Sequence, residues 1–152
     1  DVTTAEYYGQ ILVGGTSGSS YVVRTGLRIN ANGGTGAGGS DSLTYSNQTS
    51  STNFNACNIA SAGVTNLSIA VGRKSGSDVK VLDGNGNSDT DTTGVNVSTI
   101  SRFCVGGATY TGTTDLYEFN GRMYELIAYN KALSDADVNA IINYLKNKWN
   151  IV

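Results

Sequence analysis

Apolar residues recur along this chain in short runs of strand length, separated by stretches rich in Gly, Ser, Thr and Asn. The run from Val64 to Val71 is the clearest, because Leu67, Ile69 and Val71 alternate with polar or small residues, as in a half-buried strand. Further strands are expected at 7–13, 21–29, 43–49, 57–60, 79–82, 95–98 and 102–105. Many short strands joined by turn-forming residues predict an all-β fold.

The C-terminal part of the chain has two periodicities in succession. The run 123–129 is almost continuously apolar with one charge, Glu125, which predicts a strand buried on both faces or nearly so. Ser134 is the expected N-cap of a helix, and Leu133 and Val138 have the spacing of a hydrophobic staple. One apolar stripe then follows at helical spacing: Val138, Ile141, Ile142, Leu145 and Trp149. Trp149 is therefore expected in the core.

The same C-terminal segment carries a family resemblance. The sequence FNGRMYELIAYNKALSDADV, followed by Tyr144, Leu145, Lys148 and Trp149, resembles the C-terminal end of laminin-G-like domains of the concanavalin A-like lectin/glucanase superfamily. The matching positions are Phe119, Gly121, Glu125, Tyr129, Asn130, Ala132, Leu133, Ser134, Tyr144, Leu145 and Trp149. The resemblance implies a two-sheet antiparallel jelly-roll sandwich, closed by one C-terminal α-helix, that binds glycans and in some branches hydrolyses them.

Length and charge limit the classes of partner. The 152 residues fit a single domain spanning 1–152. Because the chain begins at Asp1, we expect a processed product or part of a larger protein.

The net charge is −2 and no basic patch is dense enough to follow a phosphate backbone, so no nucleic-acid partner is expected. No apolar run approaches the roughly 20 residues that span a bilayer. The resemblance implies an extracellular, cell-surface or virion location.

The residues available for catalysis argue against an enzyme. The chain contains no His, which excludes a Ser-His-Asp triad, a Cys-His pair and a His-ligated zinc site within it. It also lacks the Glu-x-Asp-x-x-Glu pattern of the glucanase branch, and on one strand Glu118 and Glu125 would face opposite sides. Glu125 among apolar neighbours needs a partner, for which Arg122 or a backbone N–H are candidates.

The two cysteines, Cys57 and Cys104, each lie next to apolar residues. They are either two buried thiols or, in an oxidising compartment, one disulfide. The sequence leaves both possibilities open.

The sequence DGNGNSDTD at 83–91 places oxygen-bearing side chains at alternate positions. These residues are Asp83, Asn85, Asn87, Asp89 and Asp91. Calcium takes about 6–8 oxygen ligands, so the segment is a candidate calcium site, and laminin-G-like domains often carry calcium. The EF-hand pattern is not met, because Ser88 and Gly94 stand at its sixth and twelfth positions. The alternative is an Asx-rich hairpin loop without metal.

The loop 108–115 and its flank supply candidate glycan contacts. Tyr110 and Tyr117 can stack on a sugar face while Asp115 accepts from hydroxyl groups; ordinary packing of the two tyrosines is the alternative. The resemblance favours a non-catalytic glycan-binding or adhesion module whose partner is a carbohydrate or a glycosylated surface. A structural component of a larger homo-oligomeric assembly, such as a phage tail-fibre or capsid-decoration domain, is the second hypothesis, with which the low charge is compatible.

Overall fold

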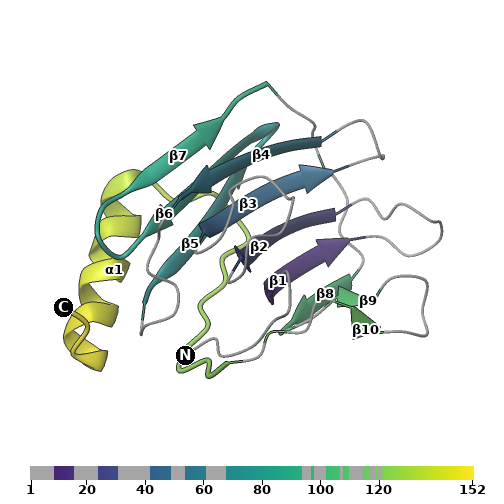
Figure 1. Cartoon of the computed structure of the whole chain (residues 1–152). Coiled ribbons are helices and arrows are strands. Elements are labelled where there is room, and N and C mark those ends of the chain that lie inside the picture. Colours follow the sequence, from purple (N-terminus) through teal and green to yellow (C-terminus); the bar gives the residue numbers. More distant parts are fainter. Residues whose placement is uncertain are drawn as a thin grey trace.

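A computed structural model of the chain describes residues 9–15, 24–30, 42–48, 54–60, 68–93, 97, 102–106, 108–109, 115–116, 119 and 121–152. Within these residues the chain forms ten β-strands followed by one α-helix, α1, which spans Asp135–Trp149 (Figure 1). The predominantly β architecture with a C-terminal helix confirms the fold class predicted from the pattern.

The larger sheet has five strands. They are β1 (Gly9–Gly15), β2 (Arg24–Asn30), β3 (Ser42–Gln48), β4 (Phe54–Ile59) and β8 (Arg102–Val105). Their spatial order is β4-β3-β2-β1-β8, and every neighbouring pair is antiparallel. The first four strands therefore form a meander, and β8 returns to the edge beside β1. The register aligns Leu27 with Tyr45 and Tyr45 with Cys57 across three strands.

A second antiparallel sheet has the order β5-β6-β7. Its strands span Ala70–Ser75, Asp78–Asp83 and Ser88–Asp91. Glycines in the left-handed region, Gly76 at φ 61° and Gly86 at φ 89°, stand in the two hairpin turns, where other residues would be strained. The short strands β9 (Ala108–Thr109) and β10 (Asp115–Leu116) form a two-stranded sheet.

The core lies between the two larger sheets. It contains Leu27, Ile29, Leu43, Tyr45, Cys57 and Ile59 from β2 to β4, and Val79 and Val81 from β6. At Gly72 on β5, an added Cβ would lie 2.3 Å from Cδ2 of Tyr45, so only glycine allows this close approach. The contacts establish a sandwich of two antiparallel sheets.

Helix α1 covers the outer face of the three-stranded sheet (Figure 1). Because side chains alternate along a strand, Val79 and Val81 of β6 face the sandwich core while Leu82 faces the helix. Leu82 packs with Ile69, Val138 and Ile142 in a second buried cluster. The molecule is thus layered as sheet, sheet and helix. No helix in the described part of the chain has the length and apolar character needed to cross a membrane.

Local signals fix the start of α1. Ser134 has extended backbone angles and its hydroxyl accepts from the Asp137 amide at 3.1 Å, so the predicted N-cap is confirmed. Leu133 packs against the cluster that contains Val138, as the predicted hydrophobic staple requires. Asp135 joins this end to the sheet through ion pairs with Arg73 on β5 and Lys80 on β6.

The predicted strand at 123–129 is wrong. The segment runs without regular structure, and its large apolar side chains are exposed by 37–54%. They are Met123, Tyr124, Leu126, Ile127 and Tyr129. A strand needs partners for its N–H and C=O groups, and none of the described sheets includes this segment. The apolar run alone therefore did not identify the structure.

Other boundaries also differ from expectation. Of the strand expected at 64–71, residues 64–67 lie outside the described part of the chain, residues 68–69 have no regular structure, and β5 begins at Ala70. Strand β7 occupies the second half of a stretch expected as a loop. Of the strand expected at 95–98, only Val97 is described; it is buried but belongs to no strand.

The structure resolves the state of Cys57, which is a buried, free thiol. Burial, with a smaller contribution from the charge of Asp89, raises the pKa of this thiol to about 12. Cys57 lies on β4 and Cys104 on β8, at opposite edges of the five-stranded sheet. Four inter-strand steps of about 4.8 Å separate these edges, whereas a disulfide needs Cα atoms within about 7 Å. The disulfide is therefore not formed.

Candidate functional site

The predicted calcium segment forms the β6–β7 hairpin, and Asp83 organises its turn. Asp83 is only 2% exposed. Its Oδ1 accepts from the backbone amides of Asn85 and Asn87, both at 2.8 Å, and its Oδ2 accepts from the Asn87 side chain at 2.7 Å. Both carboxylate oxygens are therefore engaged by the loop itself.

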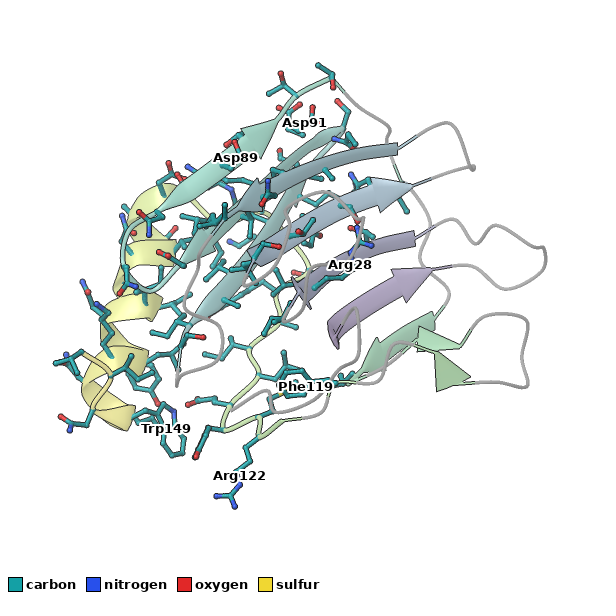
Figure 2. All side chains as sticks on the ribbon, in the orientation of Figure 1. Arg28, Asp89, Asp91, Phe119, Arg122 and Trp149 are labelled. Atoms are coloured by element: carbon teal, nitrogen blue, oxygen red, sulfur yellow. The ribbon has the colours of Figure 1, made fainter. Side chains whose placement is uncertain are left out.

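Asp89 and Asp91 point from β7 toward the neighbouring edge of the larger sheet (Figure 2). The backbone N–H of Asn58 donates to Oδ2 of Asp89 at 2.8 Å, and the backbone N–H of Ala56 donates to Oδ2 of Asp91 at 3.2 Å. Strand β4 is the edge strand, so these amides have no strand partner on that side. The two carboxylates take the place of a further strand and join the two sheets along this edge.

This arrangement bears on the metal hypothesis. The described residues contain no group of three or more His, Cys, Asp or Glu side chains placed to hold a metal ion. Asp83 is satisfied within its turn and Asp89 and Asp91 each bind a β4 amide, while Asn85 and Asn87 are exposed. In this arrangement the three carboxylates hold the hairpin through hydrogen bonds to protein amides, which is the behaviour expected of the alternative, an Asx-rich hairpin loop. Calcium binding by this segment stays a prediction.

The predicted glycan loop is described only in part. Asp115 begins β10 and pairs through its backbone with Thr109 of β9. Tyr110 and Tyr117 lie outside the described residues. The hairpin formed by β9 and β10 is thus in place, and the roles of Tyr110, Asp115 and Tyr117 stay predictions.

A different group of chemically active side chains gathers at the C-terminal end of α1. We call it the aromatic cluster; it consists of Tyr124, Glu125, Tyr144, Lys148 and Trp149. The first two residues come from the irregular segment after Phe119, and the other three come from the last turns of the helix. Tyr144 and Lys148 are four residues apart on α1, which brings their side chains to one face.

Glu125 is the polar centre of the aromatic cluster. Its Oε2 accepts from the Trp149 indole N–H at 2.8 Å, and its Oε1 accepts from the Lys148 ammonium at 3.2 Å. Arg122, one of the two candidate partners expected for Glu125, is exposed and points away from the helix (Figure 2). Trp149 is half-buried and lies outside the buried helix–sheet cluster, so its expected place in the core is wrong.

Aromatic rings surround this polar centre. The rings of Tyr124 and Trp149 have centroids 5.4 Å apart and are tilted by 58°, a geometry typical of aromatic pairs. The Lys148 nitrogen lies 5.3 Å from the centroid of the Tyr144 ring and 5.5 Å from that of Trp149. Both distances are within cation–π range.

The two charged groups stabilise each other's ionised forms. Hydrogen bonds from Trp149 and then Lys148 lower the pKa of Glu125. The Tyr144 hydroxyl and the Glu125 carboxylate raise the pKa of Lys148. At neutral pH the aromatic cluster therefore offers exposed aromatic surface beside one carboxylate and one ammonium group. Flat apolar surface next to a few oriented polar groups is a common composition of ligand sites.

Sequence reasoning missed this cluster because its members come from two segments joined only by tertiary folding. The four-residue spacing of Tyr144 and Lys148 was the one local signal. Comparisons of the chain with protein-family models, with curated proteins and with solved structures gave no match. The resemblance to laminin-G-like domains therefore rests on the residues of the C-terminal segment alone.

Proposed function

We propose that this chain is a non-catalytic glycan-binding or adhesion module with a laminin-G-like jelly roll, acting on a cell surface or virion. The observation that carries the proposal is the aromatic cluster. Tyr124 and Tyr144 are each 51% exposed, and they stand beside the Glu125 carboxylate and the Lys148 ammonium. Aromatic faces offer apolar surface to the C–H groups of a sugar, and the charged groups bind its hydroxyls. The predicted contacts Tyr110, Asp115 and Tyr117 are the second candidate surface.

A glycan array probed with the whole chain tests this function. We expect binding that Tyr144→Ala weakens by about tenfold, the effect of losing roughly 1.4 kcal/mol of ring contact. Tyr129→Ala is the matched control, because Tyr129 is equally exposed at 54% and lies outside the aromatic cluster. Absence of binding at high protein concentration would refute the function.

Repeating the array with calcium and then with a chelator separates the two candidate surfaces. The aromatic cluster needs no metal, so binding there survives the chelator. Binding that requires calcium would instead assign the site to the segments 83–91 and 110–117, with Asp115 as a sugar contact.

One observation favours the second candidate function, a structural component of a homo-oligomeric assembly. Met123, Leu126, Ile127 and Tyr129 expose apolar side chains along one short segment, and such surface is often covered by a partner. Sedimentation of the chain tests this candidate. Assembly through the segment predicts oligomers that Ile127→Asp converts to monomers, whereas a monomeric wild-type chain contradicts it.

A further inference from the structure

The Lys148 ammonium occupies a site built like a receptor for a cation. One carboxylate, that of Glu125, and two aromatic rings, those of Tyr144 and Trp149, surround it. Rings and carboxylates together are the groups that bind organic ammonium ions in proteins. The chain thus places its own positive charge in a position where a ligand's positive charge fits.

This internal cation is held loosely enough to be exchanged. The Lys148 side chain is 42% exposed, while the Glu125 side chain is 23% exposed. The Lys148 ammonium sits on a flexible four-carbon stem and can turn into water, because one ion pair and two ring contacts hold it. The Trp149 indole continues to donate to Glu125 at 2.8 Å and keeps the carboxylate in position.

Charge then distinguishes between classes of ligand. The Glu125 carboxylate would repel an anionic sugar. The Lys148 charge does not offset this repulsion, because it is already paired with Glu125. A neutral sugar leaves the pair intact and gains ring contact and hydroxyl hydrogen bonds, but no ion pair. A cationic sugar replaces Lys148 beside Glu125 and gains the carboxylate and the aromatic faces together. Arg122 does not oppose this, because it points away from the helix (Figure 2).

We propose that the ligand of the aromatic cluster is a glycan that carries a free amino group. Its ammonium group displaces that of Lys148 beside Glu125, while its sugar ring lies against the exposed tyrosine rings. This inference rests on the proposed glycan-binding function and names the substrate class of the same site.

Trp149 is the only tryptophan of the chain, so its fluorescence reports on this site alone. The experiment titrates the whole chain with glucosamine oligosaccharides and with N-acetylglucosamine oligosaccharides of equal length, at a mildly acid pH where the free amines are protonated. The two series share their backbone and differ in the ammonium group. We expect the glucosamine series to bind at least about tenfold more tightly, as for one charge-assisted contact.

Two variants assign the preference to named groups. Lys148→Met removes the internal competitor while keeping much of its apolar stem, so glucosamine oligomers should bind more tightly, whereas N-acetylated oligomers should show no gain in affinity. Glu125→Gln keeps an acceptor for the indole and removes the charge, so the preference for the free amine should disappear. Lys131→Met, an exposed cation outside the aromatic cluster, is the control and should change neither titration.

The outcomes separate this inference from the function on which it rests. Equal binding of the two series, or no gain in Lys148→Met, overturns the inference and leaves glycan binding standing. Failure of both series to change the fluorescence of the wild type and of Lys148→Met overturns the inference, and a positive glycan array would then place the function at another surface.

Discussion

At the scale of single residues, Asp83 shows how one buried carboxylate can define a hairpin. It accepts three hydrogen bonds from Asn85 and Asn87, and it is almost fully buried. Asp83→Ala would leave the two loop amides without their acceptor. We expect the free energy of unfolding to fall by about 2–3 kcal/mol, measured by urea denaturation. Asn85 is exposed and binds Asp83 through its backbone N–H, not through its side chain. Asn85→Ala should therefore change the free energy of unfolding by less than about 0.5 kcal/mol.

The same variant addresses calcium. If hydrogen bonds within the loop hold the hairpin, Asp83→Ala lowers the free energy of unfolding by the same amount in calcium and in chelator. A melting temperature that rises with calcium in the wild type but not in Asp83→Ala would instead show that this carboxylate binds the metal.

At the scale of elements, the Asp91 carboxylate at the end of β7, which binds Thr93 and the β4 edge, makes stability depend on pH. The Thr93 hydroxyl, followed by the backbone amides of Thr93 and Ala56, lowers the pKa of Asp91 below its ordinary value of 3.8. A carboxylate with a lowered folded-state pKa contributes stability above its unfolded pKa and loses it as the pH falls through the folded value. We therefore expect the melting temperature to fall with the pH below about 4.

Asp91→Asn provides the control for that titration. The amide cannot ionise but keeps an oxygen for the Ala56 N–H, so its melting temperature should be lower at neutral pH and should change less below about pH 4. A variant that loses stability in acid as steeply as the wild type would assign the acid sensitivity to other carboxylates.

Helix α1 is the element on which the outer face of the three-stranded sheet depends. Val138 and Ile142 are 4% and 6% exposed, and each such burial stabilises the fold by roughly 1.5–3 kcal/mol. We expect truncation after Ala132 to unfold or aggregate the chain, and Ile142→Ala to lower the free energy of unfolding by about 2–5 kcal/mol. Asn143→Ala on the exposed side of the helix is the control. An unchanged melting temperature after the truncation would contradict this role.

The helix was predictable from sequence because its signals are local. The Ser134 cap, the staple of Leu133 with Val138 and the apolar stripe all act within a few residues of one another. The segment 123–129 was not, because an apolar run carries no information about whether a sheet edge is available to it. Conversely, β7 has the sequence SDTD without an apolar residue, so its pattern does not predict a strand, although all four residues pair with β6.

At the scale of the whole molecule, the sandwich edge and the candidate site are both built by contacts between residues distant in sequence. Asp89 meets Asn58 and Glu125 meets Trp149 only because the sheets and the helix stack in one particular order. No spacing rule relates such pairs, so the sequence pattern did not indicate that Asp89 and Asp91 bind backbone amides of β4. It also placed Trp149 in the core, where the fold uses it to hold Glu125 at the surface.

The strand order itself has a chemical test, because it determines the distance between the two cysteines. The order β4-β3-β2-β1-β8 places Cys57 and Cys104 at opposite edges of the sheet. Four steps of strand spacing put these edges roughly 19 Å apart. After air oxidation, the mass of the monomer should not show the loss of two hydrogens that a disulfide causes. Adding a reductant should leave the melting temperature unchanged. Cys57, buried and with its thiol pKa raised to about 12, should react with a thiol reagent only after unfolding. An intramolecular disulfide found by mass spectrometry would require β4 and β8 to lie side by side, and would overturn the strand order that brings Asp89 and Asp91 to the β4 edge.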